Sequence, residues 1–371
     1  MEFDNPNDSF ANQAKQIETK LWGWHTYLSI AIALIVLIVL LTMVNFAEVW
    51  AKISDCNKAY VLIASLAHYA TYPIRGLRWH RCLIHLPLKA GAGKFGLVVF
   101  FYNFVDNVVP AKLGDVYGAH LARINAGITR SAALGSMIFI RTIDAWFILF
   151  MATLSSFLLF SAKLPKEILW SLLGGGVLAI VATSIIAFLL LLKKTLPRWL
   201  PYKIQEMILS LHSGLWPHPK ELLLITFLSV LIWTLETLWI YFLVLAFGFK
   251  LTVTHAVFIT MISLLATAFP LTPSGTGVVE FTLFSCTRVI GIGITSPIAA
   301  SITVVNRIID HWLHIGLGLI VWSIRRQIGL RTWRDVPLEE RTDTDDHVID
   351  STEVVSNTPE TPNKQEAFYA N

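Results

Sequence analysis

Arg141-Thr142-Ile143-Asp144-Ala145-Trp146 is a stretch of the chain that returns later as Arg307-Ile308-Ile309-Asp310-His311-Trp312. Each copy lies in apolar sequence, and a Gly-Ile-Thr triplet stands the same distance before each, beginning at Gly127 and at Gly293. Arginine and aspartate are rare inside membrane helices, and where they occur they mark candidate functional sites. A duplicated half with charges at matching places is typical of a transporter built from two repeats.

A break in the apolar sequence precedes each copy. The first break is Pro110-Ala111-Lys112-Leu113-Gly114-Asp115, and the second is Pro273-Ser274-Gly275-Thr276-Gly277-Val278-Val279-Glu280. They interrupt the apolar stretches at about 95–126 and 254–291, so that each half is too short to cross a bilayer alone. Because irregular backbone at membrane depth is tolerated only where protein or water satisfies it, we predict two re-entrant helical hairpins.

The composition places the rest of the chain in a membrane. Of its 371 residues, 55% are hydrophobic and 15% are charged, whereas a soluble domain carries about 25% charged residues. We predict an all-α polytopic membrane protein with about six full spans besides the hairpins. The spans lie at about 25–47, 59–74, 131–157, 169–192, 221–247 and 298–322. The second is short unless it extends through Trp79.

Lysine and arginine are distributed unevenly between the predicted loops. Loops 75–94 and 193–220, the exit of the first hairpin and the segment after the last span are basic, and all four lie on one side if both hairpins return to the side they enter from. Basic loops stay in the cytoplasm, so we expect a multi-pass protein of the cell (plasma) membrane with both termini cytoplasmic. The net charge of +4 comes from these span ends and predicts no nucleic-acid partner.

This topology gives the two copies opposite orientations in the membrane. We therefore expect an inverted repeat, with repeat 1 at about 25–160 and repeat 2 at about 165–325 of a membrane domain that covers 25–325. A polar cytoplasmic N-terminus would occupy 1–24. Segment 335–371 is acidic and polar, which predicts a disordered cytoplasmic tail.

The arginine and aspartate of each copy lie three residues apart and would share one face of a helix. One interpretation is an internal salt bridge within the pair Arg141 and Asp144 and within the pair Arg307 and Asp310, since pairing is how buried charges are tolerated. The other is that each arginine faces a cavity and exchanges its aspartate for a lipid phosphate, which suits the planar guanidinium. A resting salt bridge that opens when an anionic head group arrives would satisfy both.

The second break combines flexible backbone with the start of a half-helix near Val278. Its glycines and the unpaired amides of the helix start would hold an anionic head group, or the carboxylate of Glu280 would cap that start itself. A hairpin that needs glycine only to turn is the alternative, and both interpretations extend to the first break. The substrate-binding candidates are Lys112, Asp115, Arg141, Asp144, Ser274, Gly275, Thr276, Gly277, Glu280, Arg307 and Asp310.

Three further charges lie in or beside predicted spans. Glu236 stands in the middle of span 221–247, where a carboxylate is protonated or paired internally; as a functional group it would carry a proton for a coupled step. Arg75 and Arg78 follow span 59–74, and we expect them to snorkel to the interface.

Several of these motifs together resemble a known family. In order and spacing, residues 103–115, Arg141-Thr142-Ile143-Asp144, residues 273–280 and Arg307 resemble the lysylphosphatidylglycerol synthase transmembrane family, also called the flippase-like or UPF0104 family. The resemblance covers about residues 20–325. It implies a domain that moves aminoacylated phospholipid or a polyisoprenyl lipid between leaflets. Some members carry a fused transferase domain, and we do not expect the synthase activity of the family name in this chain.

These observations lead to a hypothesis about function. We expect a lipid flippase that moves an anionic or aminoacylated phospholipid, or a polyisoprenyl-linked lipid, between leaflets. The alternative is a non-catalytic membrane partner of a separate lipid synthase or glycosyltransferase. We expect no enzymatic activity, because the sequence contains no phosphate-binding loop and no nucleophile elbow. Three cysteines without metal or redox spacing predict no cofactor and no metal.

Overall fold

The computed structural model describes residues 46–108, 114–161, 164–194, 202–267 and 277–336. Within these ranges the regular elements are all helices, which confirms the predicted all-α class. Most of the first predicted span, the acidic tail beyond Val336 and four candidate residues lie outside the described residues. Those four are Lys112, Ser274, Gly275 and Thr276.

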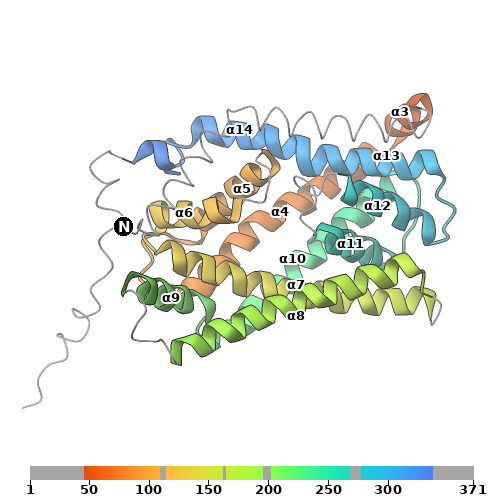
Figure 1. The fold of residues 1–371 in the computed structure, drawn as a ribbon. Coiled ribbons are helices and arrows are strands. Elements are labelled where there is room, and N and C mark those ends of the chain that lie inside the picture. The colour runs from red at the N-terminus through yellow and green to blue at the C-terminus, as the bar shows by residue number, and fades with distance from the viewer. Residues whose placement is uncertain (1–45, 109–113, 162–163, 195–201, 268–276, 337–371) are drawn as a thin grey trace, which may run out of the picture. The chain divides into compact units, whose positions relative to one another are not determined.

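The helices follow one another through short connections (Figure 1). The two halves of the described chain contain similar series: a long helix, two shorter helices and then another long one. In chain order they are α3 (Phe46–Asp55), α4 (Lys58–Leu83), α5 (Ala92–Val108), α6 (Gly114–Ala126), α7 (Arg130–Phe160), α8 (Lys166–Lys194), α9 (Tyr202–Leu215), α10 (Pro219–Ala246), α11 (Val253–Thr267), α12 (Val278–Val289), α13 (Ser296–Arg307), the π-helical η2 (Ile308–Leu313), α14 (His314–Ile324) and the 3-10 turn η3 (Trp333–Asp335).

Four helical stretches of the described chain are long and apolar enough to cross a membrane. They are Arg130–Phe160, Lys166–Leu191, Pro219–Ala246 and Ser296–Ile324, and each overlaps a predicted span. Helix α4 is more polar, but its 26 residues correspond to about 39 Å. The two apolar stretches predicted to be broken are divided into α5 and α6 and into α11 and α12.

Helices α4 and α10 lie side by side and run in opposite directions. The first residues of α4 meet the end of α10, where the amide of Asn57 donates to the carbonyl of Ala246 at 2.9 Å. At the other end Arg81 and Glu221 form an ion pair at 3.9 Å. On its other side α4 touches α5 so closely that a Cβ atom on Gly76 would lie 2.2 Å from the amide nitrogen of Gly96.

Most basic side chains gather at one end of the helices. The outer ends of α5 and α6 meet there, since the amide of Lys89 donates to the carbonyl of Ala126 at 2.9 Å. The chain beyond α14 reaches the same end, where Asn125 donates to the carbonyl of Arg331 at 2.8 Å. We call it the basic end; it includes Arg81, Lys89, Lys94, Arg123, Arg130, Lys220, Arg325, Arg326, Arg331 and Arg334.

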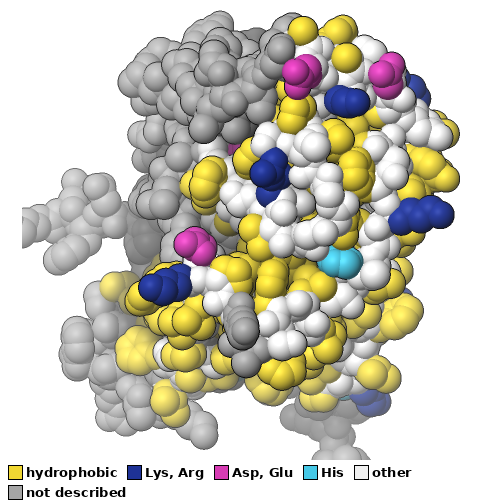
Figure 2. Space-filling view, turned by 90° about the vertical axis from the view of Figure 1, so that its right-hand side faces the viewer, with side chains coloured by type: hydrophobic (Ala, Val, Ile, Leu, Met, Phe, Trp, Pro, Cys, Tyr) yellow, Lys and Arg dark blue, Asp and Glu magenta, His cyan; other side chains and the backbone are white. Residues whose placement is uncertain are grey.

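The opposite end carries a more balanced set of charges. Figure 2 looks onto it and shows Lys or Arg and Asp or Glu side chains scattered among hydrophobic ones. Helix α3 lies here, where Ser301 on α13 donates to the carbonyl of Val49 at 3.3 Å. Arg288 at the end of α12, which donates to Ser296 at the start of α13, adds a basic residue to this end.

Large apolar side chains cover the outward faces of α7 and α8. They are too numerous for a surface in water, where single exposed apolar residues are normal but extended patches mark contact with a membrane or a partner. The exposed residues on these helices include Trp146, Phe150, Leu154, Phe157, Leu158, Trp170, Leu173, Val177, Ile180, Val181, Ile185, Phe188 and Leu191.

Candidate functional site

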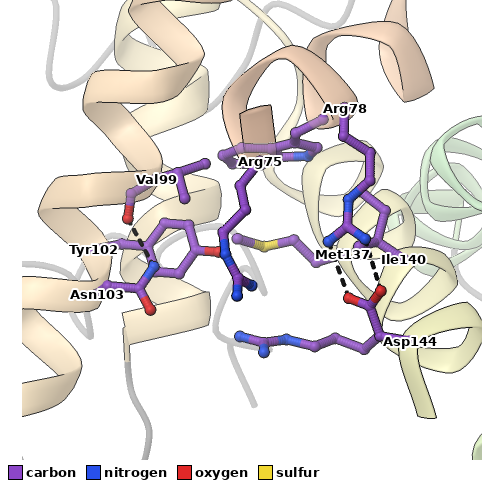
Figure 3. A pocket seen from close by; sticks show the side chains of 10 residues that line it. Arg75, Arg78, Val99, Tyr102, Asn103, Met137, Ile140 and Asp144 are labelled. Carbon is purple, nitrogen blue, oxygen red and sulfur yellow. Dashed lines mark hydrogen bonds and ion pairs between the residues drawn. The ribbon is translucent and has the colours of Figure 1, made fainter. Parts of the chain in front are cut away.

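A pocket lies where α4, α5 and α7 meet (Figure 3). Its wall combines three guanidinium groups with aromatic, aliphatic and amide side chains and a single carboxylate. The lining residues are Arg75, Arg78 and Trp79 from α4; Val99, Tyr102 and Asn103 from α5; and Met137, Ile140, Arg141 and Asp144 from α7.

Arg78 and Asp144 form the buried ion pair of this pocket. The guanidinium donates from Nη1 and Nη2 to the two carboxylate oxygens at 2.6 and 2.9 Å, in the bidentate arrangement drawn in Figure 3. Asp144 also accepts from the indole of Trp233 at 3.0 Å, and Arg78 donates to the hydroxyl of Ser229 at 2.8 Å. A buried charge is stable only when it is paired and hydrogen-bonded. Because the partners of Arg78 and Asp144 come from different helices, their bonds hold α4, α7 and α10 together.

Arg141 does not pair with Asp144, so an internal salt bridge in this helix is the wrong interpretation. Its Nη2 instead donates to Asp115 in the first turn of α6 at 2.9 Å. The physical reason is that the fork of Arg78 reaches both oxygens of Asp144 from a neighbouring helix, which a residue one turn away on the same helix does not. The side chain of Arg141 is 53% exposed, so this guanidinium is accessible from the pocket.

The second copy has a related but more buried arrangement. Arg307 pairs with Glu280 in the first turn of α12, with Nε and Oε1 2.9 Å apart. The other oxygen of Glu280 accepts from the amide of Gly277 at 2.6 Å, and Gly277 has φ of 90°, a conformation that glycine adopts without strain. Glu280 therefore caps its own helix start, as one of the two predictions had it.

Asp310 does not pair with Arg307 either, and the same correction applies. Its nearest basic partner among the ion pairs of the described chain is His68 on α4, at 3.7 Å from Nε2. The π-helical turn of η2 begins directly after Arg307 and changes the spacing that an α-helix would give the two residues.

In both halves, then, an arginine of a long helix binds an acid in the first turn of the preceding short helix. The pairs are Arg141 with Asp115 and Arg307 with Glu280. The sequence predicted these four residues as candidates but not how they pair. Near the first break, Asp106 on α5 also accepts from the amide of Gly114 at 2.7 Å, which ties the two short helices together.

Glu236 is paired internally, one of the two states predicted for it. It accepts from Arg75 at 2.8 Å, and its second oxygen lies 3.5 Å from Nδ1 of His68. Arg75 and Arg78 were predicted to snorkel, and this prediction is wrong, because α4 continues to Leu83 and carries both into the interior. The sequence did contain a signal for their burial: Asp144 and Glu236 lie inside other predicted spans and needed basic partners.

The described residues contain no cluster of His, Cys, Asp or Glu that could hold a metal ion. What the site offers instead is a set of guanidinium groups paired with carboxylates. Arginine binds phosphate with the same bidentate geometry that it uses for a carboxylate.

Long apolar helices that enclose paired charges define a helical integral membrane protein. The family model described as the lysylphosphatidylglycerol synthase TM region matches residues 27–318, so the chain belongs to this family.

Known relatives agree with this assignment. The chain is 31% identical to a UPF0104 membrane protein of Methanocaldococcus jannaschii, over 60% of this chain and 94% of the relative. It is 20% identical to a UPF0104 membrane protein of Methanothermobacter thermautotrophicus, over 78% of this chain and 92% of the relative. A shorter match, 26% identical over 98 residues, is to the glycosyltransferase AglD of Haloferax volcanii and covers 16% of that protein.

Proposed function

We propose that the protein is a lipid translocase whose pocket binds an anionic head group. The substrate would be an anionic or aminoacylated phospholipid or a polyisoprenyl-linked lipid. The observation that carries the proposal is the half-exposed guanidinium of Arg141 in a pocket lined by two more arginines and one carboxylate.

The charges of the pocket favour an incoming phosphate. Asp144 is already bound on both oxygens by Arg78, and Arg141 pairs with Asp115 rather than with Asp144. The phosphate would take the place of Asp115 on Arg141, while the Arg78–Asp144 and Arg75–Glu236 pairs stay closed. Desolvated charge-assisted hydrogen bonds of this kind contribute about 1.5–3 kcal/mol each.

An inverted repeat would let the head group reach both leaflets. Three observations support it: α4 and α10 run antiparallel, the two arginine–acid pairs match, and α7 runs opposite to α13 and α14 in Figure 1. Carriers with inverted repeats expose one central site alternately to each side. The lipid tails would remain outside, against the apolar faces of α7 and α8.

We place the basic end in the cytoplasm, because basic loops of membrane proteins stay on the cytoplasmic side. In this orientation the protein would lie in the cell membrane with both termini cytoplasmic. We propose further that it catalyses no reaction and needs no cofactor.

The test is lipid exchange between leaflets in proteoliposomes that contain a labelled anionic phospholipid. Arg141→Ala should reduce the exchange rate at least about tenfold, which corresponds to about 1.4 kcal/mol. The matched control is Arg288→Ala, which removes an exposed arginine at the opposite end and should leave the rate unchanged. Equal rates for wild type and Arg141→Ala would contradict the site.

A second candidate is favoured by the match to AglD. In it the chain is a membrane partner that holds a separate lipid synthase or glycosyltransferase and moves no lipid itself. This candidate predicts that Arg141→Ala changes recovery of that enzyme with the tagged protein, while lipid sidedness stays as in wild type.

A further inference from the structure

A second charged cluster lies deeper in the protein, around His68 of α4. Its imidazole is buried, with a side chain only 6% exposed. Nδ1 lies 3.5 Å from Oε2 of Glu236 on α10, and Nε2 lies 3.7 Å from Oδ1 of Asp310 on η2. The ring therefore stands between two carboxylates that belong to different helices.

This geometry depends on the protonation state of His68. A neutral imidazole has one N–H, so one of its nitrogens would turn a lone pair toward a carboxylate. An imidazolium donates from both nitrogens and faces both acids favourably. Neither nitrogen makes a hydrogen bond to another described residue, so the two carboxylates are the partners within reach.

The charged groups around His68 carry one more negative than positive charge. Tyr69 and Tyr72 face His68 from α4 and Trp239 faces it from α10. His314 approaches from α14, within the same ring cluster. The charged groups of the cluster are Arg75, Glu236 and Asp310, so a proton on His68 balances the two acids.

The third partner lies on the least regular element of the region. Asp310 is part of the π-helical η2, and Tyr69 donates to the carbonyl of Ile309 in the same turn at 2.9 Å. Short π-helical segments inside longer helices often occur at functional sites. The side chain of Asp310 is 36% exposed, against 6% for His68, so Asp310 is the more accessible member of this pair.

We propose that His68, Glu236 and Asp310 form a proton-binding site that couples proton uptake to the position of η2. The imidazolium on α4 attracts Asp310 of η2 and Glu236 of α10, and so holds η2 against α4 and α10. When the proton leaves by way of Asp310, the neutral ring no longer bridges the acids and η2 is released. The link from this motion to lipid movement rests on the proposed function, whereas proton binding does not.

Tryptophan fluorescence tests proton binding directly, because an imidazolium in contact with an indole quenches its emission. The ring centroids of His68 and Trp239 are 4.2 Å apart. The emission of Trp239, taken as the difference between wild type and Trp239→Phe in detergent, should fall on acidification. His68→Gln should abolish this titration.

The matched control is His314→Gln. His314 is buried beside the same rings but faces the backbone carbonyl of Phe100 at 3.2 Å rather than a carboxylate, so this variant should keep the titration. A signal independent of pH in wild type, or one that survives in His68→Gln, would overturn the proton site.

Lipid exchange in proteoliposomes then tests the coupling. Wild type should show an exchange rate that changes with pH, and His68→Gln a rate that does not. If the emission of Trp239 changes with pH but no lipid exchange occurs at any pH, the proposed function is wrong and the proton site is supported. If exchange occurs with the same pH dependence in wild type and in His68→Gln, the function stands and the coupling is overturned.

Discussion

At the scale of the residue, the protein keeps its interior charges in pairs that differ in exposure. Arg78 with Asp144 and Arg307 with Glu280 are closed and buried, whereas Arg141 with Asp115 is open to the pocket. Closed pairs fix helices to one another, and the open pair is available for exchange. Removing one partner of a closed pair leaves a buried charge without compensation.

Asp144→Asn should therefore destabilise the protein far more than Asp115→Asn. Each change removes one negative charge at nearly constant volume. We expect a loss of about 3–5 kcal/mol for the buried position and of about 0–1 kcal/mol for the partly exposed one. Thermal unfolding in detergent, followed by circular dichroism, measures both, and similar losses at the two positions would contradict the distinction between closed and open pairs.

Asp335, beyond the last membrane helix, gives the structure a pH-dependent contact. Burial alone would raise its pKa, but hydrogen bonds from Arg326 and Thr332 and the charge of Arg325 outweigh burial and lower the pKa to about 2, from 3.8. A group with a lowered pKa in the folded state stabilises that state above its unfolded pKa and loses this effect as the pH falls through the folded value.

The stability difference between wild type and Asp335→Asn should accordingly be constant above about pH 5 and shrink as the pH approaches 2. Thermal unfolding at a series of pH values measures it. A difference that grows on acidification would contradict the assigned contacts.

Single residues could be predicted from the sequence better than their partners. A charge inside an apolar run identified Arg141, Asp144, Glu236 and Arg307. Their partners could not be predicted, because pairing depends on which helices become neighbours. Arg78 was misplaced because its burial depends on Asp144 of another helix.

At the scale of the element, α4 and α5 touch backbone to backbone at Gly76 and Gly96. Gly76→Ala would place a Cβ atom 2.2 Å from the backbone of Gly96, so the helices must separate. We expect a loss of about 1–3 kcal/mol. Gly93→Ala is the control, since a Cβ atom there meets nothing within 4 Å and alanine favours the helix by about 1 kcal/mol. The midpoint of thermal unfolding should fall for Gly76→Ala and rise for Gly93→Ala.

Breaks in hydrophobicity predicted the division into α5 and α6 and into α11 and α12, since proline and glycine interrupt helices locally. The predicted span 59–74 was too short, because α4 continues through arginines that other helices neutralise. The π-helical turn of η2 had no sequence signal, because its neighbours Tyr69 and His68 lie on a distant part of the chain.

At the scale of the whole molecule, the proposed orientation can be tested by cysteine labelling. The native cysteines are buried, so the background is low. With an impermeant maleimide, Ser54→Cys on α3 should react in intact cells, and Arg326→Cys at the basic end should react only after permeabilisation. Both positions are exposed, and the reverse pattern would contradict a cytoplasmic basic end.

We propose that this chain alone carries lipid head groups across the membrane. Purified protein reconstituted into vesicles with a fluorescent anionic phospholipid, followed by quenching from outside, tests it most directly. In vesicles that contain the protein, we predict that the quencher reaches more labelled lipid than the outer leaflet holds, and finally almost all of it. A fraction that stops at the outer leaflet, as in vesicles without protein, would contradict the account.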